Sequence, residues 1–267
     1  MGNPAKDGPP PFQPTDGIQS HQSVAQPQHV QPNAFRTQLA CVTLNLGDCI
    51  RFIRFPPEVV ATMQGIINAT WPKGIQAVRD YAGSRELKLH GYPWRPHYKG
   101  NDDSRQLVLK IIEALHDIGW VLHATADLSK KQTARDTLIF QHRSPPPPPS
   151  NWICISPYRF DRLRITPPPQ PDLSAAILQT FGGEVSRHEM TREHLEIKFH
   201  GHPWVPSSED TVHMPLMILA MLETLERFGY SMYASLKDQI SNEGHDTDIL
   251  VMQRHKNWAP GMPIFHR

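Results

Sequence analysis

The side chains best suited to chemistry lie in a nine-residue stretch that occurs twice. Residues 86–94 read E-L-K-L-H-G-Y-P-W, and residues 196–204 read E-I-K-F-H-G-H-P-W. Alternate residues of a strand share one face, so each copy predicts an outward row of carboxylate, ammonium and imidazole groups. Such a row can bind charged ligands or transfer protons. The candidate binding face comprises Glu86, Lys88, His90, Glu196, Lys198 and His200, together with Arg51 and Arg164, which each follow an aspartate by three residues.

This row of charges has two interpretations. Opposite charges across neighbouring strands stabilise a solvated sheet without any function, and exposed salt bridges contribute little. However, the same side chains are kept in both copies, which exceeds what a solvated face requires. A binding or acid–base role therefore stays open beside the structural one.

Histidine is abundant, with fifteen in the chain, and His200 and His202 form an H-x-H pair that could ligate zinc. The first copy has Tyr92 where the second has His202, and no carboxylate or thiol completes a ligand set. The common nucleotide-binding, hydrolase and metalloprotease motifs do not occur. We expect neither a metal nor a cofactor.

An aromatic and basic loop follows the first copy. Aromatic and basic groups are mixed in this way at sites for single-stranded nucleic acid, but the counterpart at 205–210 is neutral to acidic. The net charge of +1 and the pI near 7.9 provide no general attraction for nucleic acid either. The loop residues concerned are Tyr92, Trp94, Arg95, Tyr98 and Lys99.

The G-x-P-W segment that ends each copy predicts a rigid turn. Glycine permits unusual backbone angles, proline fixes the next φ, and tryptophan can then cover the start of a following helix. We expect this structural role for Gly91, Pro93 and Trp94, and for Gly201, Pro203 and Trp204.

The repeat extends well beyond these nine residues. The offset of 110 persists to Gly119 and Gly229, while upstream matches lie at 113 and downstream matches at 112. The sequence thus predicts two homologous units, at 39–143 and 152–256, of about a hundred residues each, a common domain size.

Hydrophobic periodicity predicts the elements of each unit. In the first unit it indicates a strand over 41–55, a helix from Pro57, a hairpin over 75–90, a helix over 102–118, and strands at 120–126 and 137–141. The order β-α-β-β-α-β-β is a split βαβ, ferredoxin-like variant. We therefore expect an α+β fold with the helices on one face of a mostly antiparallel sheet.

Three segments fall outside the units. Residues 1–38 are rich in Pro and Gln and poor in large apolar side chains, so we expect disorder. Residues 144–151 contain five consecutive prolines and predict an extended polyproline linker. Residues 257–267, with Trp258 and Phe265, are expected to form a loose tail.

The cysteines and the hydropathy of the sequence indicate in which cellular compartment the protein is expected. The three cysteines form no paired framework, which favours a reducing environment. No apolar run is long enough for a membrane span, and the N-terminus lacks a signal-peptide core. We expect an intracellular protein, cytoplasmic or nuclear, that is neither secreted nor membrane-spanning.

The functional hypothesis is a non-enzymatic binding or adaptor protein that acts through protein–protein association. Its partners could include SH3, WW or profilin-like domains at Pro145–Pro149, because such domains bind preformed polyproline helices. Two alternatives remain: an enzyme that uses the Glu/Lys/His row, and a single-stranded nucleic-acid binder. The oligomeric state is left open.

Overall fold

The computed structural model describes residues 37–94, 101–126, 137–207, 210–238 and 247–264, all within one compact unit, Thr37–Arg267. The tail predicted at the N-terminus lies almost wholly outside these residues. The first repeat contains β1 (Leu39–Asn45), β2 (Cys49–Ile53), α1 (Pro57–Thr70), β3 (Ile75–Tyr81), β4 (Ser84–Leu89), α2 (Asn101–Asp117), β5 (Trp120–Ala126) and β6 (Thr137–His142). The second contains β7 (Ser150–Tyr158), β8 (Arg162–Thr166), α3 (Pro171–Phe181), the short 3₁₀ helix η1 (Gly182–Glu184), β9 (Val185–Met190), β10 (Leu195–Phe199), α4 (Asp210–Arg227), β11 (Ser231–Asp238) and β12 (Thr247–His255).

Each repeat forms one six-stranded antiparallel sheet. The strand order is β3-β4-β2-β1-β6-β5 in the first sheet and β9-β10-β8-β7-β12-β11 in the second, so corresponding strands occupy corresponding places. All the strand pairs described are antiparallel. The predicted α+β class and the duplication are confirmed.

The strand expected over 41–55 is in fact a hairpin. β1 and β2 pair through a tight turn in which Leu46 adopts a φ of +56°, and Arg159 adopts +53° in the corresponding turn between β7 and β8. Neither residue is a typical turn former, although Gly47 and Asp48 follow Leu46 in the first turn and are turn residues that the strand prediction passed over. Each repeat is therefore ββαββαββ.

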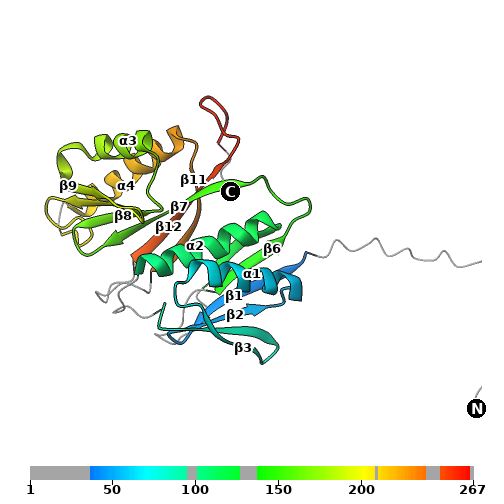
Figure 1. Ribbon diagram of the computed structural model, residues 1–267. Helices are drawn as coiled ribbons and strands as arrows, with labels where there is room; N and C mark the ends of the chain where they lie inside the picture. Colours follow the sequence, from blue (N-terminus) through cyan, green and yellow to red (C-terminus); the bar gives the residue numbers. More distant parts are fainter. Residues whose placement is uncertain (1–36, 95–100, 127–136, 208–209, 239–246, 265–267) are drawn as a thin grey trace, which may run out of the picture. The chain divides into compact units, whose positions relative to one another are not determined.

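The two helices of the first repeat cover one face of its sheet (Figure 1). Pro57 occupies the first turn of α1, where its missing N–H costs nothing. Val59, Val60, Met63 and Ile67 recur on one side of α1 and are buried, because they pack onto apolar side chains of the sheet. The other sheet face is called the open face below.

Helix α2 also packs on the second repeat. It lies against β7 and β8, on the open face of the second sheet (Figure 1). At its C-terminal end, the His116 ring contacts Trp152 and Tyr233 at centroid distances of 5.0 and 5.9 Å. The core of the first repeat therefore continues into the second through Trp152, Cys154, Tyr233, Leu236, Ile249 and Val251.

Edge strand β5 contributes a directional contact to the same joint. The backbone N–H of Leu122 donates to the Tyr233 hydroxyl at 2.7 Å, and both groups are buried. The hydroxyl thus satisfies an amide that has no neighbouring strand to accept it. The two repeats thus share a core and hydrogen bonds, whereas the sequence left open whether they pack together.

The expected loose C-terminal tail is ordered at its start. Trp258 lies so close to Gly229 that a Cβ on the glycine would come within 2.2 Å of the indole. The indole Nε1 of Trp258 donates to the Met262 carbonyl at 3.2 Å. The segment folds back over the turn between α4 and β11 because Gly229 leaves room for it. Phe265 lies outside the described residues.

Candidate functional site on the open sheet faces

The repeated glutamate of the first sheet lies within a cluster of arginines. Glu86 accepts hydrogen bonds from Arg51 Nε and Arg79 Nε, both at 2.7 Å, and its side chain is fully buried. Arg51 also donates to the side chain of Asn45 at 3.1 Å and lies 4.2 Å from the ring centroid of Tyr81. Glu86 does point to the open face, but the arginines and the tyrosine shield it from water.

The second sheet repeats this arrangement with different neighbours. Glu196 accepts from Arg162 and, at 2.8 Å, from Arg164 Nε. The guanidinium of Arg164 lies 3.6 Å from the Tyr158 ring centroid. It also donates to Asp102 at 2.9 Å, at the start of α2. The cluster of the second repeat therefore joins the two repeats, whereas that of the first repeat does not.

The electrostatics of both glutamates favour the ionised state. Burial by itself raises the pKa of Glu86, but hydrogen bonds and charges from Arg51 and Arg79 outweigh it and bring the pKa below 4.5. Burial likewise raises the pKa of Glu196, and Arg164 and Arg162 lower it by more. A carboxylate held ionised between two arginines is a poor proton donor at neutral pH.

The rest of the predicted row does not join this cluster. Lys88 lies 3.8 Å from Asp48, and Lys198 lies 3.5 Å from Asp161, so the same lysine–aspartate contact recurs in both repeats. His90 and His200 follow the ends of β4 and β10 and are exposed. Among the described residues, neither imidazole lies within ion-pair distance of a carboxylate. The structure thus separates the three groups that acid–base chemistry would require together.

The two G-x-P-W turns are anchored to their sheets by equivalent hydrogen bonds. Trp94 Nε1 donates to the Cys49 carbonyl at 3.1 Å, and Trp204 Nε1 donates to the carbonyl of Arg162, the counterpart of Cys49, at 2.6 Å. The preceding glycines adopt φ values of +79° and +69°, which favour glycine. The indoles thus anchor each turn to its sheet, in keeping with the structural role expected of them.

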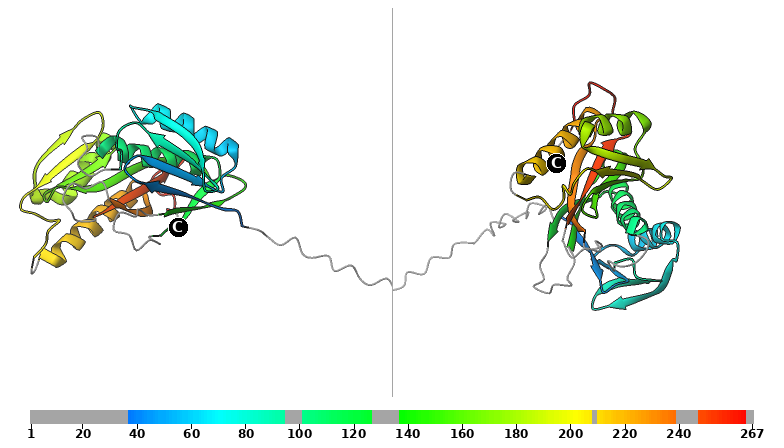
Figure 2. Two further views of the ribbon diagram at one scale, coloured as in Figure 1. Left: turned by 90° about the horizontal axis from the view of Figure 1, so that it is seen from below. Right: turned by 90° about the vertical axis from the view of Figure 1, so that its left-hand side faces the viewer.

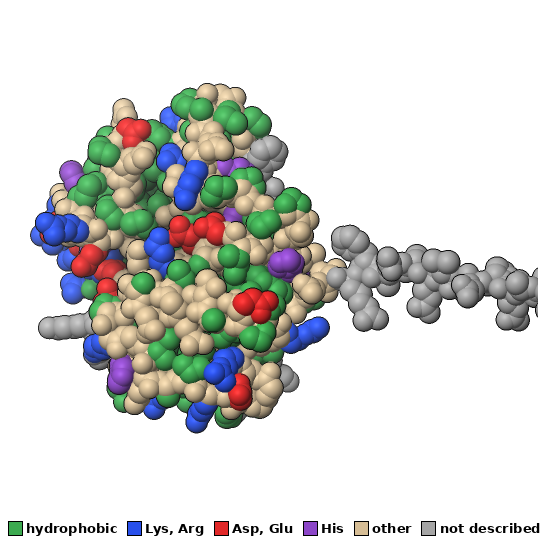
Figure 3. Space-filling view, turned by 45° about the vertical axis from the view of Figure 1, so that its right-hand side comes forward, with side chains coloured by type: hydrophobic (Ala, Val, Ile, Leu, Met, Phe, Trp, Pro, Cys, Tyr) green, Lys and Arg blue, Asp and Glu red, His purple; other side chains and the backbone are tan. Residues whose placement is uncertain are grey.

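The expected aromatic and basic loop is only partly described. Tyr92 is 43% exposed, but Trp94 is completely buried and offers no surface for base stacking. Arg95, Tyr98 and Lys99 lie outside the described residues. On the face drawn in Figure 3, basic side chains are interspersed with acidic and apolar ones rather than gathered in a stripe. The described residues therefore provide no stacking platform around Trp94.

Within the part of the chain that the structure describes, one cluster has potential metal ligands, and it is not the H-x-H pair. Ligand atoms of Asp102, Glu193 and His194 lie within 4.8 Å of one another, at the joint between the repeats. Arg164 already donates to Asp102, so its positive charge balances the carboxylate without a cation. His200 and His202 are both exposed. The cluster was not evident from sequence, because α2 and the β9–β10 turn lie ninety residues apart.

The cysteines do not resemble activated nucleophiles. Burial, followed by a hydrogen bond to Asp48, raises the pKa of Cys49 to about 11, and burial also raises the pKa of Cys41. All three cysteines are free thiols, and Cys154 is buried. Reactive cysteines have lowered pKa values, so a thiolate mechanism finds no support at Cys41 or Cys49.

The most unusual surface is one that sequence reasoning missed. Val212, Leu216 and Leu219 are 64%, 56% and 54% exposed, and their spacing of four and three residues places them on one side of α4. We call these three residues the α4 stripe. The signal was present in the sequence, since residues 211–222 contain no Lys, Arg, Asp or Glu. A segment of this composition is also typical of a buried core helix, so the sequence alone did not mark it as a surface.

Together, the fold and the repeated clusters define a tandem α+β protein with two copies of one domain. One protein-family model, described simply as a domain, matches both copies, over residues 38–141 and 151–253. The chain belongs to this family and contains its domain twice. Neither the curated proteins nor the solved structures contain a match.

The helices also bear on membrane association. Among the described helices, none combines the length and the apolar character needed to cross a bilayer.

Proposed function

We propose that this chain is a non-enzymatic binding protein that associates with another protein through the α4 stripe. The observation that carries the proposal is a difference between the repeats. Leu109 on α2 is 2% exposed, whereas its counterpart Leu219 on α4 is 54% exposed. The leucine at this position is therefore buried in the first repeat and exposed to solvent in the second.

The composition of the two helices supports this interpretation. Helix α2 has charged residues at Asp102, Asp103, Arg105 and Lys110, whereas the corresponding positions of α4 are Val212, His213, Pro215 and Ala220. Scattered apolar residues are normal on a surface, but a continuous apolar helix side marks an interaction site. The first half of α4 stands at the periphery of the second repeat (Figure 2, gold).

The internal joint indicates what kind of surface the partner offers. Leu109, the counterpart of Leu219, belongs to a core cluster that includes Trp152, Tyr233 and Val251 of the second sheet, and α2 packs against the open face of that sheet. We therefore assign the α4 stripe to an apolar β-sheet face of a partner protein. A second copy of this chain is a poorer match, because its open face has Leu39 and His123 in place of Trp152 and Tyr233.

Enzymatic and nucleic-acid functions are less well supported. The glutamates are paired with arginines, the histidines stand apart from them, and Trp94 is buried. Pro145, Pro146, Pro148 and Pro149 are exposed, so docking of a polyproline-binding domain stays a second prediction. The free thiols fit an intracellular compartment.

A photo-crosslinking experiment on the full chain tests the proposal. p-Benzoylphenylalanine replaces Leu219 in one variant and Gln179, an exposed residue of α3, in the control. We expect one defined protein adduct from position 219, with its crosslink mapped to an apolar sheet face, and no such adduct from position 179. In the purified complex, Leu216→Asp should weaken binding about ten-fold or more, as is typical of a central apolar contact.

Two outcomes would contradict the proposal. One is equal crosslinking from positions 219 and 179, which would show that the stripe has no specific partner. The other is an adduct with a second copy of the chain, together with a dimer mass in sedimentation equilibrium. Because Leu216 is exposed, its variant should retain the thermal midpoint of the native chain, and this control separates lost binding from lost folding.

A further inference from the structure

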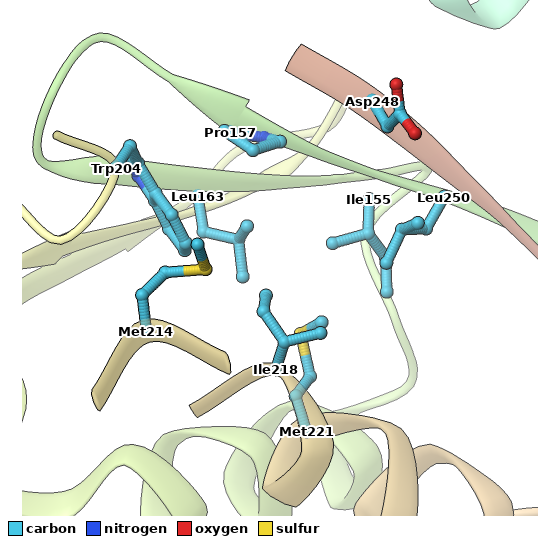
Figure 4. A pocket seen from close by; sticks show the side chains of 9 residues that line it. All are labelled: Ile155, Pro157, Leu163, Trp204, Met214, Ile218, Met221, Asp248 and Leu250. Carbon is cyan, nitrogen blue, oxygen red and sulfur yellow. The ribbon is translucent and has the colours of Figure 1, made fainter. Parts of the chain in front are cut away.

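The inner side of α4 also differs from that of α2, and the difference lies beside the second G-x-P-W turn. In the first repeat Trp94 is completely buried, and Ser104 Oγ donates to the Pro93 carbonyl at 2.8 Å, which ties the start of α2 to the turn. In the second repeat the same place contains a cavity of about 270 Å³ beside Trp204 (Figure 4).

Two substitutions explain why the second repeat stays open. Met214 stands at the position of Ser104, and its thioether has no hydroxyl to donate to the turn. Pro215 stands at the position of Arg105, inside α4, where it lacks an N–H and crowds the carbonyl four residues before it. The first turns of α4 therefore do not close onto Trp204 as α2 closes onto Trp94.

The cavity is lined almost entirely by apolar side chains. Trp204 forms one wall, Met214, Ile218 and Met221 approach from α4, and Ile155 and Leu250 lie on the opposite side (Figure 4). Asp248 stands at the rim, where its carboxylate accepts a hydrogen bond from the Ser235 hydroxyl at 2.6 Å. None of the lining side chains except Asp248 is charged, so burial here favours an uncharged ligand.

We propose that this cavity is a binding site for a small, neutral, aromatic molecule. An indole wall favours offset or edge-on contact with another ring, and methionine sulfur makes favourable contacts with ring edges. An apolar cavity of about 150 Å³ is known to hold benzene, so the present volume accommodates two fused rings. The site lies on the opposite side of α4 from the α4 stripe and is independent of protein association.

Methionine methyl NMR on the full chain tests this site. The chain has nine methionines, and [¹³C]methyl labelling reports on Met214 and Met221 in the lining. Met63, buried in the first repeat, and Met190, exposed on β9, serve as internal controls. Titration with indole should shift the Met214 and Met221 methyl signals in a saturable manner and leave Met63 and Met190 unchanged.

A charged ligand and a filled cavity provide the matched controls. Indole-3-carboxylate has the same rings, and burial of its charge should weaken binding about ten-fold or more. Ile218→Phe should fill the cavity and abolish the indole-induced shifts, with an unchanged Met63 signal as evidence of folding. If that variant does not fold, Met214→Phe, at the half-buried entrance, replaces it.

Three results would overturn the inference. The first is the absence of a saturable shift at Met214 and Met221. The second is an equal shift at Met190, which would indicate adsorption to the surface. The third is equal binding of indole and its carboxylate, which would exclude an apolar, neutral site. None of these results bears on the α4 stripe, so failure here leaves the proposed protein association standing.

Discussion

At the residue scale, the two buried glutamates occupy equivalent positions but have different structural roles in the two repeats. Glu86 holds together the open face of its own sheet, through Arg51 and Arg79. Glu196 positions Arg164, which reaches across to Asp102 on the other repeat. A single inherited carboxylate–arginine pair has thus become a link between repeats in one case only.

Acid should weaken the fold through Glu86, and Glu86→Gln tests this. The folded pKa lies below the ordinary 4.5, so below pH 4.5 the unfolded chain binds more protons and stability falls as pH falls. At pH 7 the variant should lose about 2–3 kcal/mol, since Arg51 is left without its buried anion. Between about pH 5 and 3, the range in which a paired carboxylate is protonated, the urea midpoint of the variant should fall less steeply than that of the native chain, because glutamine does not take up a proton.

Lys88→Gln provides the control for this experiment. Lys88 lies 3.8 Å from Asp48 and its side chain is 45% exposed, so its loss should cost less than about 1 kcal/mol at pH 7. Equal losses in the two variants would contradict the view that Glu86 is a buried, fully paired carboxylate.

The sequence predicted which residues share the open face, but not how they are buried there. Alternation along a strand is local, and it correctly places Glu86 opposite Leu87. Burial depends on Tyr81 from a neighbouring strand in the first repeat and on α2 in the second, and these contacts are non-local. Strand β4 ends at Leu89, so His90 of the predicted row follows the strand and is exposed.

At the element scale, α2 and α4 derive from one ancestral helix and now have different surroundings. Helix α2 lies between its own sheet and the second sheet, whereas the described contacts of α4 are with α3 and β11 of its own repeat. The helix predicted over 102–118 lies within one residue of α2 at each end, because its apolar periodicity is strong. The hairpins β1–β2 and β7–β8 were read as single strands, since their turns lack Gly, Asn and Pro at the positions of positive φ.

Leu109→Ala and Leu219→Ala form a matched pair that measures this difference. Leu109 is 2% exposed, so its truncation leaves a cavity and should cost about 2–5 kcal/mol. Leu219 is 54% exposed, and its truncation should change stability by less than about 0.5 kcal/mol. Chemical denaturation of the full chain gives both values, and similar losses would show that the α4 stripe is covered within the chain.

At the scale of the whole molecule, the two repeats are joined by a shared core. One hydrophobic core contains side chains from both repeats, and the Tyr233 hydroxyl accepts the Leu122 amide across the joint. This association could not be predicted from the sequence. The polyproline linker left open whether the units pack together, and the apolar character of Trp152 and Val251 was equally compatible with a core inside the second repeat.

A shared core predicts a single cooperative transition that Tyr233→Phe lowers in both repeats together. Loss of the hydroxyl leaves a buried amide without an acceptor and should cost about 1–3 kcal/mol. Hydrogen exchange by mass spectrometry should show faster exchange in peptides of both sheets. Faster exchange confined to the second repeat would contradict a common core.

The joint between the repeats also limits what dissection of the chain can reveal. A cut within the proline run would strip Leu109 and His116 of their cover on one fragment and leave Trp152 and Tyr233 bare on the other. Each fragment would then expose an apolar surface that is buried in the intact chain. Deletion mapping with such fragments would identify proteins that bind the newly exposed joint. Point variants of the intact polypeptide avoid this artefact and are the better way to find its natural binding partners.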